Sequence, residues 1–251
     1  MKVFSNISSI LVDDKWSWQD RIFLTFDIDW AHDTVLHDTI DLVEEAGVAA
    51  TWYATHETPV LERLRSSQNS ELGIHPNFNF LLEGDGRNGR NTAEVIERIF
   101  NIVPEAKSVR SHSMAQSSNV MGAFRKFGLT HDVNHFVPAH SGIRLRPWLD
   151  WNGLCRVPYF WEDDVECMHA LQINMTELVL RQGLKVFDFH PIHVFLNTEN
   201  LERYESTRHL HSNPVELIKH RFKGIGTRTR LIELLKLALS PRTVDLAPAR
   251  S

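Results

Sequence analysis

Four apolar runs of the chain each stop at a short segment that carries histidine or carboxylate side chains. These segments occupy residues 26–29, 73–79, 109–112 and 187–191. If the runs are parallel strands, their carboxyl ends lie on one face of a sheet or barrel, and side chains distant in sequence converge there. The pattern therefore predicts an α/β fold with an active site on that face, and the residue types best fit a hydrolytic metal site.

The length and charge of the chain limit its domain organisation and its partners. A chain of 251 residues can form one large α/β domain. We expect a single domain over residues 1–251, with a barrel core at 20–200, a helical segment at 201–240 and a flexible tail at 241–251. Lys and Arg number 27 against 32 Asp and Glu, which gives a net charge of −5 and no general attraction to phosphates. No nucleic acid partner is predicted.

The start of the chain and its two cysteines favour a cytoplasmic location. Residues 1–6 contain no continuous apolar segment of the kind found in a secretory signal. Cys155 and Cys167 are therefore expected to be reduced thiols. No apolar stretch approaches the roughly 20 residues that span a bilayer, so no transmembrane segment is predicted. The oligomeric state stays open.

Seven short apolar runs are predicted to be strands, and helical patterns separate several of them. The runs cover residues 22–26, 48–53, 71–75, 108–110, 129–133, 156–160 and 184–189. Helices are predicted from Asp33 or Thr34 to Gly47, at 59–65, from the capping-box-like Asn91 and Glu94 onward, at 121–127 and at 231–239. Residues 135–152 show no clear period and are predicted to form a long functional loop.

Four motifs resemble, in their order along the chain, those of the NodB-homology polysaccharide deacetylases, also called carbohydrate esterase family 4. They lie at residues 24–29, 50–53, 71–75 and 189–190, and the string at 187–197 looks like the WbmS-like branch found in bacterial O-antigen loci. The resemblance implies a distorted seven-stranded (β/α) barrel of TIM-barrel type, in agreement with the seven runs. It also implies hydrolysis of an acetamido or acetyl ester group on a sugar by a metal-activated water.

The first motif of this resemblance supplies two acids. It implies that Asp27 is the general base and Asp29 a metal ligand. The family usually has adjacent acids here, whereas Ile28 separates them in this chain, so the two carboxylates share a face of the strand unless its end bends. The alternative is an acidic strand end that caps the next helix.

The second motif completes the metal site that the resemblance implies. His75 corresponds to the family's first metal-binding histidine, and Asn79 stands where the family has a second one. An Asp29, His75 and Asn79 site would hold one divalent ion, with zinc favoured and cobalt, nickel or manganese as alternatives. In the competing interpretation, His75 only hydrogen-bonds within a polar cleft and Asn79 caps a turn.

The later motifs add an arginine and an acid. Arg110 matches the arginine that holds the base ionised and oriented, although an ordinary surface ion pair is the alternative. His190 matches the general acid that protonates the leaving amine. We expect Asp132 to orient His190 by accepting its second ring proton.

Five further residues are predicted to contact substrate. These are His112, His193, Trp161, Glu162 and Asp163. The aromatic ring could stack on a sugar and the acids could bind hydroxyl groups. For His193 the alternative is a structural role. For residues 161–163 the alternative is a solvated acidic loop.

The sequence leads to one favoured function and two alternatives. The favoured one is a metal-dependent hydrolase that deacetylates a sugar unit of bacterial surface polysaccharide, and its substrate could be an acetylated sugar, a nucleotide sugar or a lipid-linked glycan. The first alternative is metal-free hydrolysis of a cyclic amide, as in allantoinase-like relatives. The second is a catalytically inactive carbohydrate-binding protein of O-antigen assembly.

Overall fold

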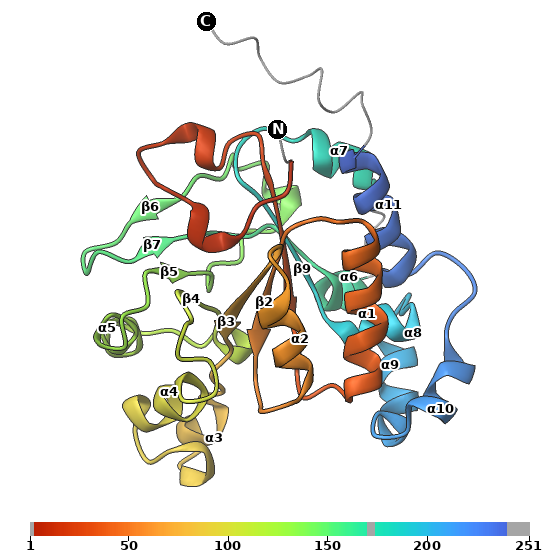
Figure 1. Ribbon diagram of the computed structural model, residues 1–251, viewed down its shortest axis with the longest axis horizontal. Helices are drawn as coiled ribbons and strands as arrows, with labels where there is room; N and C mark the ends of the chain where they lie inside the picture. The colour runs from red at the N-terminus through yellow and green to blue at the C-terminus, as the bar shows by residue number, and fades with distance from the viewer. Residues whose placement is uncertain (1–2, 170–173, 240–251) are drawn as a thin grey trace, which may run out of the picture.

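A curled β-sheet forms the centre of the protein, and helices cover its outer surface (Figure 1). The computed structural model describes residues 3–169 and 174–239. Across this part of the chain, nine strands lie in the order β6-β7-β5-β4-β3-β2-β1-β9-β8. They are β1 (Ile22–Asp27), β2 (Ala50–Ala54), β3 (Ser70–Ile74), β4 (Ser108–Val109), β5 (His131–Asp132), β6 (Trp148–Leu149), β7 (Cys155–Arg156), β8 (Trp161–Glu162) and β9 (Lys185–Phe189).

Four longer strands hold the middle of the sheet together. β1 pairs in parallel with β2 on one side and with β9 on the other, and Phe26 lies beside both Trp52 and Phe189. Every residue of β1, β2 and β9 is buried, as expected for strands covered on both faces. The rings of Phe26 and Trp52 stack with centroids 4.1 Å apart. These parallel strands bring their carboxyl ends, and the acids and histidines that follow, to one end of the sheet.

The helices alternate with the strands through the first half of the chain and gather after β9. They are α1 (Asp33–Glu45), α2 (Val60–Ser66), α3 (Asn79–Leu82), α4 (Thr92–Phe100), α5 (Ser118–Lys126), α6 (Asp163–His169), α7 (Met175–Leu180), α8 (Pro191–Leu196), α9 (Leu201–Thr207), α10 (Pro214–Leu217) and α11 (Thr227–Leu239). Short 3-10 turns are η1 (Ile7–Ser9), η2 (Lys15–Ser17), η3 (Gly86–Asn88), η4 (His112–Met114), η5 (Ala139–Ser141), η6 (Arg208–Leu210) and η7 (Ile218–His220). α1 and α11 both pack against α8.

Of the two helix caps that were predicted, the one at α4 is confirmed and the one at α1 differs. Asn91 caps α4 by accepting the backbone N–H of Glu94 at 3.1 Å, as predicted. At α1, however, the cap is the ring nitrogen of His32, which accepts the N–H of Thr34 at 3.1 Å. The prediction of Asp33 or Thr34 as the cap is therefore displaced by one or two residues.

The sheet differs from the predicted seven-stranded barrel. Nine strands are present in the described residues, and the sheet curls into a half-barrel whose edges are β6 and β8. The predicted run at 156–160 begins in β7 and ends just before β8, and β6 lies inside the predicted long loop. β4 and β5 lie inside predicted runs, whereas the two-residue strands β6 and β8 are too short to produce a readable sequence period, which explains the wrong count.

The amino-terminal segment closes the end of the sheet opposite the motif-bearing ends. The backbone N–H of Ile7 donates to Thr51 Oγ1 at 3.1 Å, and Ser8 N–H donates to the Glu71 carboxylate. Thr51 and Glu71 lie at the starts of β2 and β3. The other end of these strands is therefore the one left for a functional site.

Four further predictions concern the cysteines, the last helix, membrane-spanning segments and the tail. Cys155 and Cys167 are free and buried. Leu231, Leu234 and Leu235 are buried on α11, in agreement with the predicted last amphipathic helix. Within residues 3–169 and 174–239, no helix has both the length and the apolar character that crossing a membrane requires. The predicted tail at 241–251 lies outside the described residues.

Candidate active site

The chain turns sharply where β1 ends, and this turn separates the directions of Asp27 and Asp29. Asp29 has φ 37° and Trp30 has φ 54°, both in the left-handed region that side chains other than Asn, Asp and Gly adopt at a cost. The backbone N–H of Trp30 donates to Thr55 Oγ1 at 3.0 Å. Because the strand end bends, the residue between the two acids does not force both carboxylates onto one face.

The two acids lie on either side of the His75 ring. Asp27 Oδ2 is 3.5 Å from His75 Nδ1, and Asp29 Oδ1 is 3.3 Å from His75 Nε2. His75 follows β3 directly and is 2% exposed, so its position is fixed by the core. A buried imidazole thus links the predicted base to the predicted metal ligand.

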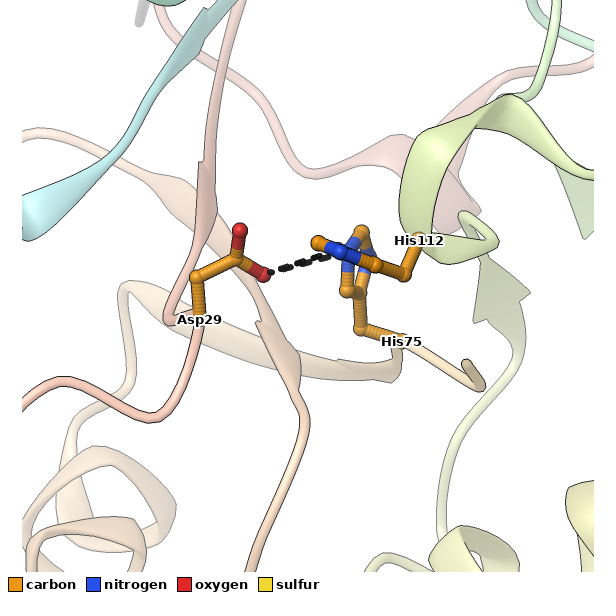
Figure 2. Close-up of side chains that lie close together, drawn as sticks. All are labelled: Asp29, His75 and His112. Carbon is orange, nitrogen blue, oxygen red and sulfur yellow. Dashed lines mark hydrogen bonds and ion pairs between the residues drawn. The ribbon is translucent and has the colours of Figure 1, made fainter. Parts of the chain in front are cut away.

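His112 completes a three-residue cluster with Asp29 and His75 (Figure 2). His112 Nδ1 lies 3.4 Å from Asp29 Oδ1 and 3.3 Å from His75 Nε2. Figure 2 shows the two imidazole rings and the carboxylate converging on one point from three different segments of the chain. The three potential ligand atoms therefore form a nearly equilateral triangle.

The triangle fits a divalent metal ion. Ligand atoms about 2.1 Å from a tetrahedral zinc ion would be about 3.4 Å from one another. Asp29 Oδ1 is buried and has no conventional hydrogen-bond partner, as expected of an atom whose partner is a cation. Burial opposes ionisation of Asp29, but the attraction of the nearby His112 and His75 rings outweighs it and holds the pKa of Asp29 well below its usual range. The ligand set is thus one carboxylate and two imidazoles.

Asn79 does not join this cluster, contrary to the prediction. Its side-chain Nδ2 donates to Ser113 Oγ at 3.1 Å, and its own backbone N–H donates to Asn77 Oδ1 at 2.9 Å. Asn79 is the first residue of α3, and the turn from Pro76 directs it to the rim. His112, predicted as a substrate contact, lies where the Asn79 ligand was expected.

Asp132 supports the loop that carries His112 and does not contact His190. Its Oδ1 accepts Asn134 Nδ2 at 2.7 Å, and Asn134 Oδ1 accepts the backbone N–H of Ser111 at 2.7 Å. The N–H of His112 then donates to the Pro76 carbonyl at 3.0 Å. The predicted orienting role of Asp132 is therefore wrong in its geometry, since its buried carboxylate anchors a neighbouring strand end.

Arg110 lies at the centre of a buried polar network, as its motif predicts. One terminal nitrogen of Arg110, Nη1, donates to Asp27 Oδ1 at 3.0 Å and also bonds Asp188. Nη2 donates to Thr25 Oγ1 at 3.0 Å. The guanidinium lies between two tyrosine rings, 4.9 Å from the centroid of Tyr53 and 4.6 Å from that of Tyr159. The guanidinium is therefore held in one orientation toward Asp27. Because Arg110 is only 1% exposed, the alternative of an ordinary surface ion pair is excluded.

Asp163 is the residue that orients His190. His190 Nδ1 lies 2.7 Å from Asp163 Oδ1, and the backbone N–H of His190 donates to Asp163 Oδ2 at 2.9 Å. His190 Nε2 points the other way, 3.7 Å from Asp29 Oδ2. Burial lowers the pKa of His190, but the charge of Asp163 outweighs it and raises that pKa well above its usual range. Burial also raises the pKa of Asp163 to about 6.

Trp161 and Glu162, two other predicted substrate contacts, are buried and bond neighbouring side chains. Trp161 is 2% exposed, packs on Phe187 and Phe189, and donates its indole N–H to Glu166 at 3.1 Å. Glu162 is buried and accepts the Tyr159 hydroxyl at 3.2 Å. Trp161 and Glu162 line a separate cavity of about 470 Å³ and not the cleft that contains Asp29 and His190, so the sugar contact predicted for Trp161 stays a prediction.

A cavity of about 650 Å³ opens over the cluster, a volume within the usual range for ligand sites. Asp29, His112, His190 and His193 are among its lining residues. The ring of His193 packs against His190 and Tyr204, with centroids 5.8 and 4.9 Å away. The cleft is lined further by Trp30, Ala31, His32, Asp164, Met168, Ile192, Leu201, Tyr204, Arg208, His211 and Ser212.

Comparison with known proteins agrees with the resemblance in the sequence. A family model described as WbmS-like polysaccharide deacetylase matches residues 24–208. A crystal structure from Bordetella bronchiseptica, described as a polysaccharide deacetylase involved in O-antigen biosynthesis, is 48% identical, covers 94% of this chain and 98% of its own, and has a TM-score of 0.90. The search of curated proteins finds no match.

Two more distant structures are also similar. A family 4 carbohydrate esterase from Streptomyces lividans, in complex with acetate, is 13% identical over 86% of this chain and 87% of its own, with a TM-score of 0.46. A family 4 carbohydrate esterase from Bacillus anthracis is 14% identical over 86% of this chain and 82% of its own, with a TM-score of 0.40.

Proposed function

Because the chain belongs to the WbmS-like polysaccharide deacetylase family, we propose that it removes an acetyl group from a sugar unit of a bacterial O-antigen or its precursor. The family makes it a hydrolase of amide or ester bonds in sugars. One observation carries the proposal. Asp29 and His112 of the candidate metal cluster and the oriented acid His190 line one cleft. The oriented base Asp27 lies buried behind them, 3.5 Å from the His75 ring of the same cluster.

Asp27 is the general base of the proposed reaction. Arg110 fixes one of its oxygens, and the other faces the His75 ring 3.5 Å away. A carboxylate that bonds a guanidinium is held in one orientation. It can therefore accept the proton that the attacking water loses.

Asp29, His75 and His112 would hold one divalent metal ion, with zinc favoured by the carboxylate and imidazole donors and cobalt, nickel or manganese as alternatives. When bound there, such an ion polarises an acyl carbonyl and lowers the pKa of water. The chain itself contributes the fixed positions of the three donors and the bend that turns Asp29 toward them.

His190 is the general acid. Its Nδ1 is committed to Asp163, so Nε2 is the ring atom directed at the cleft. The raised pKa of His190 keeps the ring protonated at neutral pH, which is the state an acid needs before the bond breaks. Nε2 can then donate its proton to the leaving amine or alcohol, and Asp163 stabilises the ring orientation throughout.

The form of the substrate and the cytoplasmic location remain predictions from the sequence. Acetate release can be measured from three probes, namely an N-acetylated nucleotide sugar, an N-acetylated oligosaccharide and an O-acetylated oligosaccharide. We expect the wild type to release acetate from at least one of them, and Asp27→Asn and His190→Gln to lose most of that rate. Trp16→Ala, an exposed position in η2 outside the cleft, is the matched control.

Two results would overturn the proposal. In the first, the wild type releases no acetate from any probe even with zinc, cobalt, nickel or manganese added. In the second, both catalytic variants keep the full rate. Opening of a cyclic amide without metal, or sugar binding without turnover, would then take its place.

A further inference from the structure

Trp30 is a large aromatic side chain left exposed beside the candidate metal cluster. It is 44% exposed and lines the cleft, whereas Trp52 and Trp161 are 1% and 2% exposed in the core. Its ring meets His112 edge-on, with centroids 5.1 Å apart and planes at 81°. An indole face is thus available at the mouth of the cavity, one ring away from the proposed reaction centre.

The backbone holds Trp30 in this place at a cost. Its φ of 54° lies in the left-handed region, which is unfavourable for a bulky residue. The backbone N–H is tied to the hydroxyl of Thr55, which is itself 1% exposed. Glycine would relieve the strain at this position, yet the chain places its largest side chain there. Strained residues persist only where the surrounding structure holds them in place, and they cluster at active sites and ligand clamps.

The wall that includes Tyr204 is also built of packed rings. The ring of Tyr204 lies between those of His193 and His211, with centroids 4.9 Å away on each side. His193 in turn contacts His190, the proposed acid. The cleft therefore combines an exposed indole next to the metal cluster with a rigid wall next to the acid, within a volume of about 650 Å³.

We propose that Trp30 is a platform on which the pyranose ring of the acetylated sugar stacks. A pyranose face presents C–H groups with slight positive charge, and these complement the electron-rich face of an indole. Stacking there would bring a ring substituent toward His112 and His190 and would favour acetylated pyranosides over small acyclic acetates. The inference rests on the proposed function, and it adds a specificity-determining residue to it.

Binding and turnover should be measured separately. Binding of methyl glycosides of N-acetylated hexosamines can be followed by saturation-transfer NMR and titration, on the wild type and on Trp30→Ala, Trp30→Phe and Trp16→Ala. Turnover can be followed as kcat/KM for an acetylated pyranoside relative to ethyl acetate, which has no ring. This ratio is independent of the fraction of active enzyme.

We expect Trp30→Ala to weaken pyranoside binding about tenfold, through KM more than kcat, and to lower the selectivity ratio equally. Trp30→Phe should keep most of the pyranoside affinity and most of the selectivity ratio. Trp16→Ala should match the wild type in both quantities. Trp30→Gly should lose selectivity while its Tm stays equal or rises, because glycine removes the backbone strain. A purely structural tryptophan would lower the Tm without changing the ratio.

The outcomes separate this inference from the proposed function. If the wild type binds the pyranosides through Trp30 but releases no acetate, the platform stands and the hydrolase proposal fails. If acetate is released but Trp30→Ala binds and selects as the wild type does, the platform is wrong and the hydrolase proposal stands. A wild type that binds none of the pyranosides also overturns the platform.

Discussion

Asp163 binds His190 twice, through the ring Nδ1 at 2.7 Å and through the backbone N–H at 2.9 Å. Asp163 is the first residue of α6 and His190 directly precedes α8, so one carboxylate joins two helix starts and fixes an imidazole between them. With Nδ1 occupied, Nε2 is the ring atom that faces the cleft. The same contact raises the pKa of His190, so it controls both the direction and the charge of the proposed acid.

Replacing Asp163 should therefore change the pH profile as well as the rate. In Asp163→Asn the charge that raises the pKa of His190 is lost. The ring then releases its proton at lower pH, and the alkaline limb of the plot of kcat against pH shifts to lower pH. We expect kcat to fall about 10- to 100-fold. Asp132→Asn is the matched control, because it removes a different buried carboxylate that bonds Asn134, and its alkaline limb should stay in place. A shift in Asp132→Asn instead would restore the prediction made from sequence.

The two carboxylates that share Arg110 should differ in their effect on catalysis. Burial raises the pKa of Asp188 to about 8 against the pull of Arg110, so this group already favours its protonated form near neutral pH. Asp188→Asn mimics that form, keeps an oxygen that can accept from Thr25, and should cost less than about tenfold in kcat. Asp27→Asn removes the base and should cost about 10²- to 10⁴-fold. Equal losses in the two variants would contradict the assignment of Asp27.

Buried His193 should make the protein less stable in acid. Burial, with the charge of His190, lowers the pKa of His193 to about 3. The unfolded chain takes up its proton near pH 6.5, so the stability contributed by the neutral ring is present above that pH and is lost as pH falls toward 3. The expected loss from this group between pH 7 and pH 5 is about 2 kcal/mol.

Denaturant unfolding at pH 7 and pH 5 measures this effect. His193→Phe keeps a ring in the stack and cannot titrate, so the difference between the two pH values should shrink by that amount. His209→Asn, at an exposed position, should leave the difference as in the wild type. An unchanged pH dependence in His193→Phe would show that His193 is not held neutral in the fold.

The longer strands could be read from the sequence, as could the two-residue strands β4 and β5, which lie inside predicted runs. β1, β2 and β9 are fully buried runs of five or six residues, β3 is buried over its last three residues, and each was predicted within one or two residues. β6 and β8 depend on their partners for pairing and leave no period of their own. The sheet was therefore predicted to be α/β and parallel, but with the wrong number of strands.

The candidate site likewise contains residues that the sequence predicted and residues that it did not. The structure brings together Asp27 at the end of β1 and four residues that end or follow predicted strands, namely Asp29, His75, Arg110 and His190. His112 and Asp163 take positions that the sequence reasoning gave to Asn79 and Asp132. Their placement depends on how loops turn after short strands, including the left-handed Ser113 beside His112, and spacing alone does not encode this.

Metal content tests whether Asp29, His75 and His112 form a metal site. The protein should be purified without a tag or chelating chromatography and analysed by inductively coupled plasma mass spectrometry. We predict about one divalent ion per chain in the wild type and in Asn79→Ala, and loss of that ion in His112→Ala and Asp29→Ala. Retention of metal by His112→Ala with loss by Asn79→Ala would contradict the account. So would a wild type that takes up no zinc, cobalt, nickel or manganese on dialysis.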